Sequence, residues 1–161
     1  MNNKIIFTFI IIVCQILLPH SVSAQLISHP LQHIDSLQNI NKRYIVVFIK
    51  TDWCTYCNTM SNTTFKNYDV VNTLNNKFYF SELNAEDKQE IKFNLQTYKF
   101  IPSGIKTGIH ELAQHLGKIK GEVFYPSICI LNKNYEIIFQ WNELLSASEL
   151  LKILNEIYNG S

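Results

Sequence analysis

Two cysteines that directly follow an apolar run constrain the fold of this chain more than any other feature. Residues 44–49 are continuously β-branched or aromatic, which is typical of a strand buried on both faces of a helix-covered sheet. Cys54 and Cys57 come next, and a C-x-x-C motif in that position is expected to begin a helix. The sequence therefore predicts two thiols at the carboxyl end of a central strand.

The start of a helix is a position that favours thiol–disulfide exchange by the two cysteines. The first turn of a helix has unpaired amides and the positive end of the helix dipole, and both stabilise a thiolate. The thiolate is the nucleophile in thiol–disulfide exchange. Cys54, at the helix start, is expected to meet these amides and water and to attack. Cys57, one turn inward and shielded, is expected to resolve the mixed disulfide.

A metal site, a haem site and an inert structural disulfide are the alternatives for the same cysteines. His110 and His115 complete a zinc-like pattern, but the two pairs are much farther apart than the usual spacing of roughly 12–15 residues. These histidines also turn toward different sides of a helix. Asn58 follows the motif, so the C-x-x-C-H pattern of covalent haem is not met. No metal and no other cofactor is predicted.

The N-terminus is predicted to be a signal peptide spanning residues 1–24. Lys4 precedes an uncharged apolar run at 5–18, and a small-residue cleavage site ends at Ala24. The run is shorter than the roughly 20 residues that cross a bilayer, which argues against an uncleaved anchor. Cleavage near Ala24 leaves residues 25–161 as one domain, periplasmic or secreted, without stable membrane insertion.

The charge balance excludes one class of partner. The chain has 14 Lys and Arg residues and 13 Asp and Glu residues, and loss of Lys4 with the signal peptide makes the two numbers equal. Because no excess of either sign remains, neither a nucleic acid nor an anionic membrane is a predicted partner.

Helical and strand patterns alternate along the rest of the chain. The expected helices lie at 30–41, 54 to about 60, 70–74, 110–116 with Gly117 as C-cap, and after Ser146 or Ser148. The expected strands lie at 44–49, 78–83, 127–131 and 135–141. An insertion at about 85–108 contains a small hairpin at 91–100 and a loop at 102–108. This order predicts an α/β fold: a central mixed β-sheet of about four strands flanked by helices.

The dipeptide Tyr125–Pro126 stands directly before a predicted core strand, a position where proline is tolerated. Together with Trp53 and the C-x-x-C motif, it makes the chain from residue 40 to 159 resemble the thioredoxin superfamily. The resemblance implies a thioredoxin fold in which Pro126 follows a cis bond and packs against the disulfide. It also implies that the backbone of Tyr125 pairs with a substrate chain and that Trp53 is partly exposed beside the reactive thiol.

Two departures separate the chain from thioredoxins proper. Thr55 and Tyr56 stand between the cysteines where thioredoxins have Gly-Pro, and Phe48 stands where they have a buried Asp. The chain looks more like exported thioredoxin-like proteins, which implies a protein thiol–disulfide oxidoreductase acting on protein thiols and disulfides. Reduction, oxidation and isomerisation all stay open, with a slight preference for reduction. Because exported compartments are oxidising, a reductase would need a membrane electron donor.

Two other functions are alternatives. A thioredoxin fold with an inert disulfide would be a binding module that holds a partner through the insertion at 85–108. A thiol peroxidase would need an activating Arg near Cys54, and the sequence offers no obvious one.

Three further side chains are expected to have structural roles. Cys129 alternates with apolar residues in a core strand and is expected to be a small buried hydrophobe. His110 and Glu111 lie near a loop that would border the active face. A capping or surface role is expected for them, because no paired group accompanies the histidine.

Overall fold

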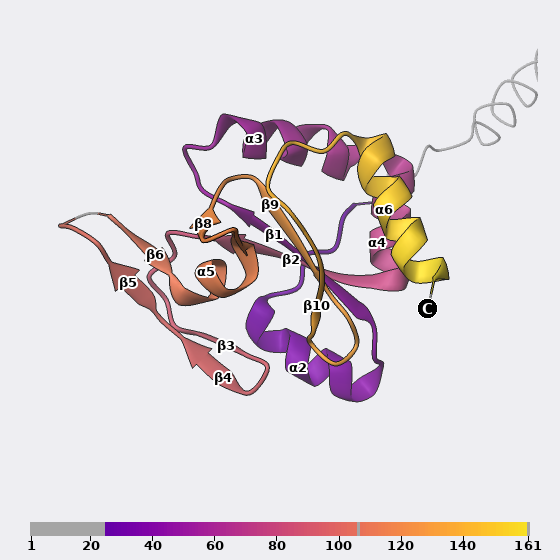
Figure 1. Ribbon diagram of the computed structural model, residues 1–161. Coiled ribbons are helices and arrows are strands. Elements are labelled where there is room, and N and C mark those ends of the chain that lie inside the picture. The colour runs from indigo at the N-terminus through magenta and orange to yellow at the C-terminus, as the bar shows by residue number, and fades with distance from the viewer. Residues whose placement is uncertain (1–24, 106, 161) are drawn as a thin grey trace, which may run out of the picture.

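A four-stranded mixed sheet in the order β10-β9-β1-β2 forms the centre of the protein (Figure 1). β1 (Tyr44–Lys50) runs parallel to β2 (Phe78–Asn84) and antiparallel to β9 (Ser127–Leu131). β9 also pairs antiparallel with β10 (Ile137–Trp141) at the edge. This sheet and the helices around it confirm the predicted α/β architecture.

The computed structural model describes residues 25–105 and 107–160. The predicted signal peptide at 1–24 lies outside these residues. Within the described ranges, no helix is long and apolar enough to cross a membrane.

Helices lie on both faces of the sheet (Figure 1). They are α2 (Leu31–Ile40), α3 (Thr55–Asn62), the 3₁₀ turn η1 (Thr64–Lys66), α4 (Tyr68–Lys77), α5 (Glu111–Gly117) and α6 (Ala147–Asn159). The last helix begins at one of the two predicted caps. The Ser146 hydroxyl accepts from the Glu149 amide, and the Glu149 carboxylate accepts from the Ser146 amide, which completes a capping box.

The side chains of β1 alternate between two hydrophobic clusters, one on each face of the sheet. Ile45, Val47 and Ile49 belong to the cluster that α2 and α5 cover. Val46 and Phe48 belong to the cluster that α3, α4 and α6 cover. Because successive side chains of a strand point to opposite faces, a central strand with helices on both sides is apolar throughout.

The segment between β2 and α5 contains two hairpins. β3 (Ile91–Phe93) and β4 (Gln96–Tyr98) form the predicted one. β5 (Phe100–Pro102) and β6 (Gly108–His110) form a second where a loop was expected, and it projects from the body of the protein in Figure 1. Its two ends meet, because the Glu111 amide donates to the Lys99 carbonyl and the Lys99 amide donates to the Glu111 carboxylate.

Asp35 of α2 holds the turn of the first hairpin. Its carboxylate accepts from the amides of Asn94 and Leu95, which both have positive φ, and from the Tyr135 hydroxyl at 2.7 Å. These bonds join the hairpin to the domain and satisfy amides that the turn leaves without a partner.

Gly117 has a different role from the one predicted. It is the last residue of α5 and not its cap, and it does not have positive φ. A Cβ at this position would lie 3.0 Å from Ile49 Cδ1 and 3.2 Å from Val123 Cγ1. The absence of a side chain therefore allows α5 to pack closely on the sheet and on β8 (Glu122–Val123), which forms a short hairpin with β7 (Lys118–Ile119).

Candidate functional site

The two cysteines lie at the start of α3, directly after the turn that follows β1. Cys54 is the N-cap of the helix, and its Sγ accepts a hydrogen bond from the Cys57 amide at 3.1 Å. The two sulfurs form a disulfide with a Cα–Cα distance of 5.2 Å. Cys54 is 4% exposed and Cys57 is fully buried, so the expected amide contact is present while the contact of Cys54 with water is small in this oxidised form.

Phe48 occupies the buried position where thioredoxins proper have an acid. Its ring packs against Phe65, with 4.8 Å between ring centroids, and it belongs to the same cluster as Cys54 and Cys57. Among the residues that the structure describes, no Asp or Glu side chain is buried. A proton that leaves Cys57 therefore meets no buried carboxylate.

Tyr125 and Pro126 lie next to this end of β1. The bond between them is cis, as the resemblance implied. Ile49 pairs with Ser127, so Pro126 comes one residue past the end of the β1–β9 ladder. The Tyr125 ring meets the Trp53 ring edge-on, with 6.0 Å between centroids. The structure thus brings Trp53, Tyr125 and Pro126 to the end of the sheet that carries the cysteines.

Trp53 is 66% exposed and is held by a residue that the sequence did not indicate. Its indole nitrogen donates to Glu86 at 3.1 Å. Glu86 comes from the segment after β2, and no motif links it to the cysteines in the sequence. Burial raises the pKa of the Tyr125 hydroxyl, and the nearby negative charge of Glu86 raises it further.

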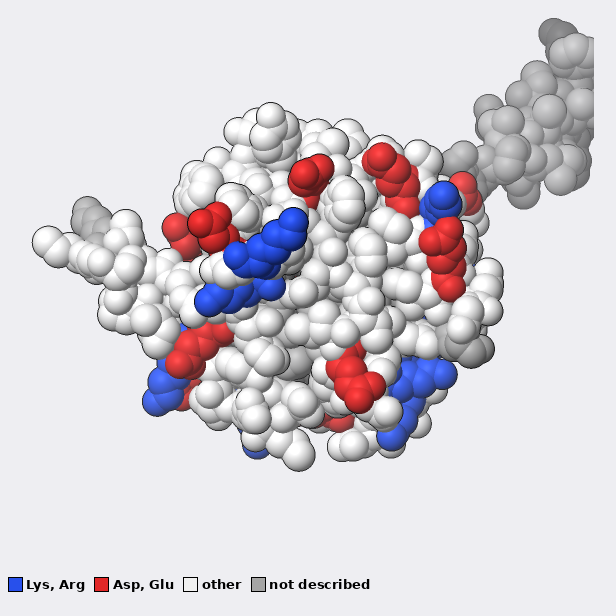
Figure 2. Space-filling model, viewed as in Figure 1, with Lys and Arg blue, Asp and Glu red and all other residues white. Residues whose placement is uncertain are grey.

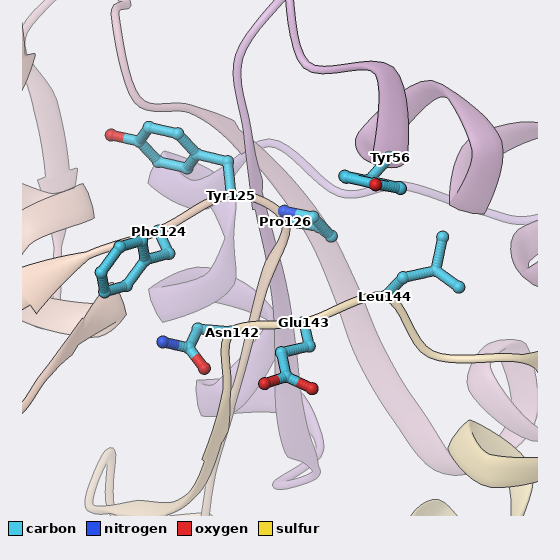
Figure 3. Close-up of a pocket in the computed structure, with 7 residues that line it drawn as sticks. All are labelled: Tyr56, Phe124, Tyr125, Pro126, Asn142, Glu143 and Leu144. Atoms are coloured by element: carbon cyan, nitrogen blue, oxygen red, sulfur yellow. The ribbon is translucent and has the colours of Figure 1, made fainter.

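An open groove of about 520 Å³ lies beside Pro126 (Figure 3). Three segments line it: Tyr56 of α3, residues 124–126 before β9, and residues 142–144 between β10 and α6. In Figure 3, Phe124 and Tyr125 lie on one side of Pro126, with Tyr56 and Leu144 on the other. Tyr56 is one of the two residues that replace Gly-Pro between the cysteines, so this departure contributes to one wall of the groove.

The remaining cysteine of the described chain is a free and buried thiol. Cys129 is fully buried in β9, where it pairs with Val47 of β1. Burial raises the pKa of its thiol to about 12. These observations match the expected role of a small buried hydrophobe.

His110 caps α5 as expected, but it is fully buried and not at the surface. Its Nδ1 accepts from the Leu112 amide at 3.1 Å, and its Nε2 lies 3.0 Å from the Gln89 carbonyl, to which it donates. Within the described ranges, no group of three or more His, Cys, Asp or Glu side chains is placed to hold a metal ion.

Charged side chains are dispersed over the face of the molecule that Figure 2 shows. Figure 2 shows separate small groups of acidic and basic residues and no continuous block of either sign on the face in view. This face therefore offers no extended basic surface of the kind that binds a phosphate backbone.

Comparisons with known proteins show the family of this chain and the solved structures that share its fold. The model of a family described as thioredoxin-like domain matches residues 32–158. No curated protein sequence matches significantly. Among solved structures, a DsbH oxidoreductase is 11% identical with a TM-score of 0.59 and covers 88% of this chain and 90% of its own. A thioredoxin from Thermus thermophilus is 18% identical with a TM-score of 0.58, covering 83% and 87%. A thioredoxin-fold protein from Helicobacter pylori is 17% identical with a TM-score of 0.56, covering 74% and 71%.

Proposed function

Since the chain belongs to the family of thioredoxin-like domains, we propose that it is a protein thiol–disulfide oxidoreductase whose reactive pair is Cys54 and Cys57. One observation carries the proposal. The Cys57 amide points at Cys54 Sγ at the N-terminus of α3, and the same contact stabilises a thiolate on Cys54 once the disulfide is reduced.

The reaction follows from the roles of the two sulfurs. In the reducing direction, the Cys54 thiolate attacks one sulfur of a substrate disulfide, and the other substrate sulfur leaves as a thiolate that takes up a proton. Cys57 loses its proton and attacks Cys54 Sγ, which releases the second substrate thiol and closes the Cys54–Cys57 disulfide. Two electrons pass from the protein dithiol to the substrate, and an external dithiol must restore the reduced pair.

Trp53, Tyr125 and Pro126 are proposed to bind the substrate chain. Their position at the cysteine end of the sheet, beside an open groove, supports this role. An extended substrate segment would lie along the groove and place its disulfide at Cys54. Proximity of this kind converts a bimolecular attack into one between oriented groups.

We assign the protein to an exported compartment, with residues 1–24 as signal peptide and 25–161 as the domain. The family match begins at residue 32, which supports that division. In an oxidising compartment, the reducing direction requires a dithiol donor, and a membrane protein is the proposed source.

A binding module is the second candidate, and the second hairpin favours it. Ile101 is 43% exposed and Ile105 is fully exposed, so the projecting hairpin presents apolar side chains that a partner would cover. In that function, the disulfide would be structural and the cysteines would not exchange.

Insulin reduction by dithiothreitol separates the two candidates. An oxidoreductase accelerates precipitation of the insulin B chain, and the Cys54→Ser/Cys57→Ser variant does not. A wild-type rate equal to that of dithiothreitol alone would overturn the redox proposal and favour the binding module. Equilibration with glutathione then gives the reduction potential of the Cys54/Cys57 pair, and with it the direction of electron flow. A potential of about −270 mV indicates a reductase, and one of about −120 mV indicates an oxidase.

A further inference from the structure

The groove beside the redox pair is lined by one charged side chain, and that side chain forms no ion pair with another described residue. Tyr56, Phe124 and Leu144 supply apolar surface, and Glu143 supplies the carboxylate (Figure 3). The ion pairs formed within residues 25–105 and 107–160 involve other carboxylates. A ligand in the groove would therefore meet an apolar wall and an unpaired negative charge.

Two more carboxylates border the same end of the sheet. Glu86 accepts from the Trp53 indole, and Asp52 accepts from the Asn84 side-chain amide at 3.1 Å. Both partners are neutral, and neither carboxylate forms an ion pair in the described part of the chain. Three carboxylates that form no ion pair in the described chain, those of Glu143, Glu86 and Asp52, thus lie in the groove or at this end of the sheet, although the whole chain is close to neutral.

On the basis of the proposed function, we propose that this groove selects protein disulfides whose reactive cysteine is flanked by an apolar residue and by a lysine or arginine. The apolar side chain lies against Tyr56 and Leu144, and the cation lies near Glu143. Attraction between exposed opposite charges is modest, so the expected preference over a neutral residue is about threefold to fivefold. An acidic residue at the same place is disfavoured by a similar factor.

Peptide disulfides test this selectivity. Three two-cysteine peptides share the same sequence, with Leu beside one cysteine, and differ only in a Lys, Gln or Glu two residues from it. The pre-reduced protein is mixed with each peptide, and the second-order rate constant of disulfide reduction is measured. The expected order is Lys, then Gln, then Glu, and 0.5 M salt should compress the differences because it screens exposed charges.

Glu143→Gln is the critical variant, and Glu156→Gln is its matched control. Glu156 is an exposed acid of α6 that pairs with Lys152, and it does not line the groove. The ratio of the Lys to the Gln rate should fall to about one in Glu143→Gln and stay at the wild-type value in Glu156→Gln. Unfolding midpoints would verify that both variants fold.

The outcomes separate the inference from the function on which it depends. Equal wild-type rates for the three peptides would overturn the proposed selectivity for charge. A preference that Glu143→Gln retains would overturn the role of Glu143. Failure of the wild-type protein to reduce even hydroxyethyl disulfide would instead overturn the proposed redox function.

Discussion

The buried thiol of Cys129 predicts a specific loss of stability at alkaline pH. Its pKa is raised from 9.0 to about 12 by burial, because the thiolate would lie in an apolar core. In the unfolded chain, the thiol loses its proton near the ordinary pKa. Since the folded-state pKa is the higher of the two, the stabilising contribution is complete below pH 9 and is lost as the pH rises toward 12.

The size of the loss follows from the two pKa values. At pH 10.5, the unfolded thiol is mostly ionised and the folded one is mostly protonated. The pH exceeds the unfolded-state pKa by about 1.5 units, and each unit corresponds to about 1.4 kcal/mol, so the predicted loss relative to pH 8 is about 2 kcal/mol. That is a large fraction of the stability of a typical domain.

Chemical denaturation at pH 8 and pH 10.5 measures this loss. The comparison is between a Cys54→Ser/Cys57→Ser parent, which prevents disulfide exchange, and the same protein with Cys129→Ala. Tyrosine and lysine titrations are shared by the two proteins and cancel. The parent should lose about 2 kcal/mol more than the alanine variant between the two pH values. A difference below about 0.5 kcal/mol would refute the argument that burial keeps this thiol protonated.

Three further tests by substitution address other parts of the structure. Cys57→Ser should accumulate mixed disulfides with protein substrates, visible on non-reducing gels, whereas Cys54→Ser should not; the reverse pattern would exchange the two roles. Phe48→Ala should lower the free energy of unfolding by about 3–5 kcal/mol, because it leaves a cavity in the cluster that holds the disulfide. A cost below about 1 kcal/mol would contradict that packing. Ser146→Ala should cost about 1 kcal/mol by removing the cap of α6, with Ser148→Ala as a nearly neutral control; equal costs would contradict the assigned cap.

Features that depend on local chemistry could be predicted from the sequence. The apolar run of β1 requires cover on both faces, and the C-x-x-C motif at its end coincides with a helix start. Pro126 precedes a core strand, where the missing amide costs no ladder bond. In each case, one residue type or one sequence periodicity is enough to indicate the local structure.

The second hairpin could not be predicted, because its residues have no clear strand pattern in the sequence. Pro102 and Gly108 are typical loop residues, yet they face each other in the second hairpin. The hairpin needs glycine at 108, because a Cβ there would overlap the Phe100 ring and the Ile101 carbonyl oxygen. Pro102 is tolerated in a two-stranded ribbon with free edges.

The same distinction applies to the candidate site. The cysteines, Trp53 and the Tyr125–Pro126 dipeptide have recognisable local patterns. Glu86 and Glu143 have none, because only the packing of the segments after β2 and β10 brings Glu86 to Trp53 and Glu143 to the groove. A carboxylate in a loop has the same sequence signature whether it borders a reactive thiol or faces bulk water.

The two hydrogen bonds between Lys99 and Glu111 make the second hairpin a place where the chain can be lengthened or shortened during evolution with little loss of stability. Two hydrogen bonds fix both ends of the hairpin, so additions or deletions between them leave the ends in place. Loop-closure entropy rises by only about 0.6 kcal/mol for each doubling of loop length. Descendants of this chain could therefore acquire new recognition segments there, or lose the second hairpin, without altering the geometry at Cys54.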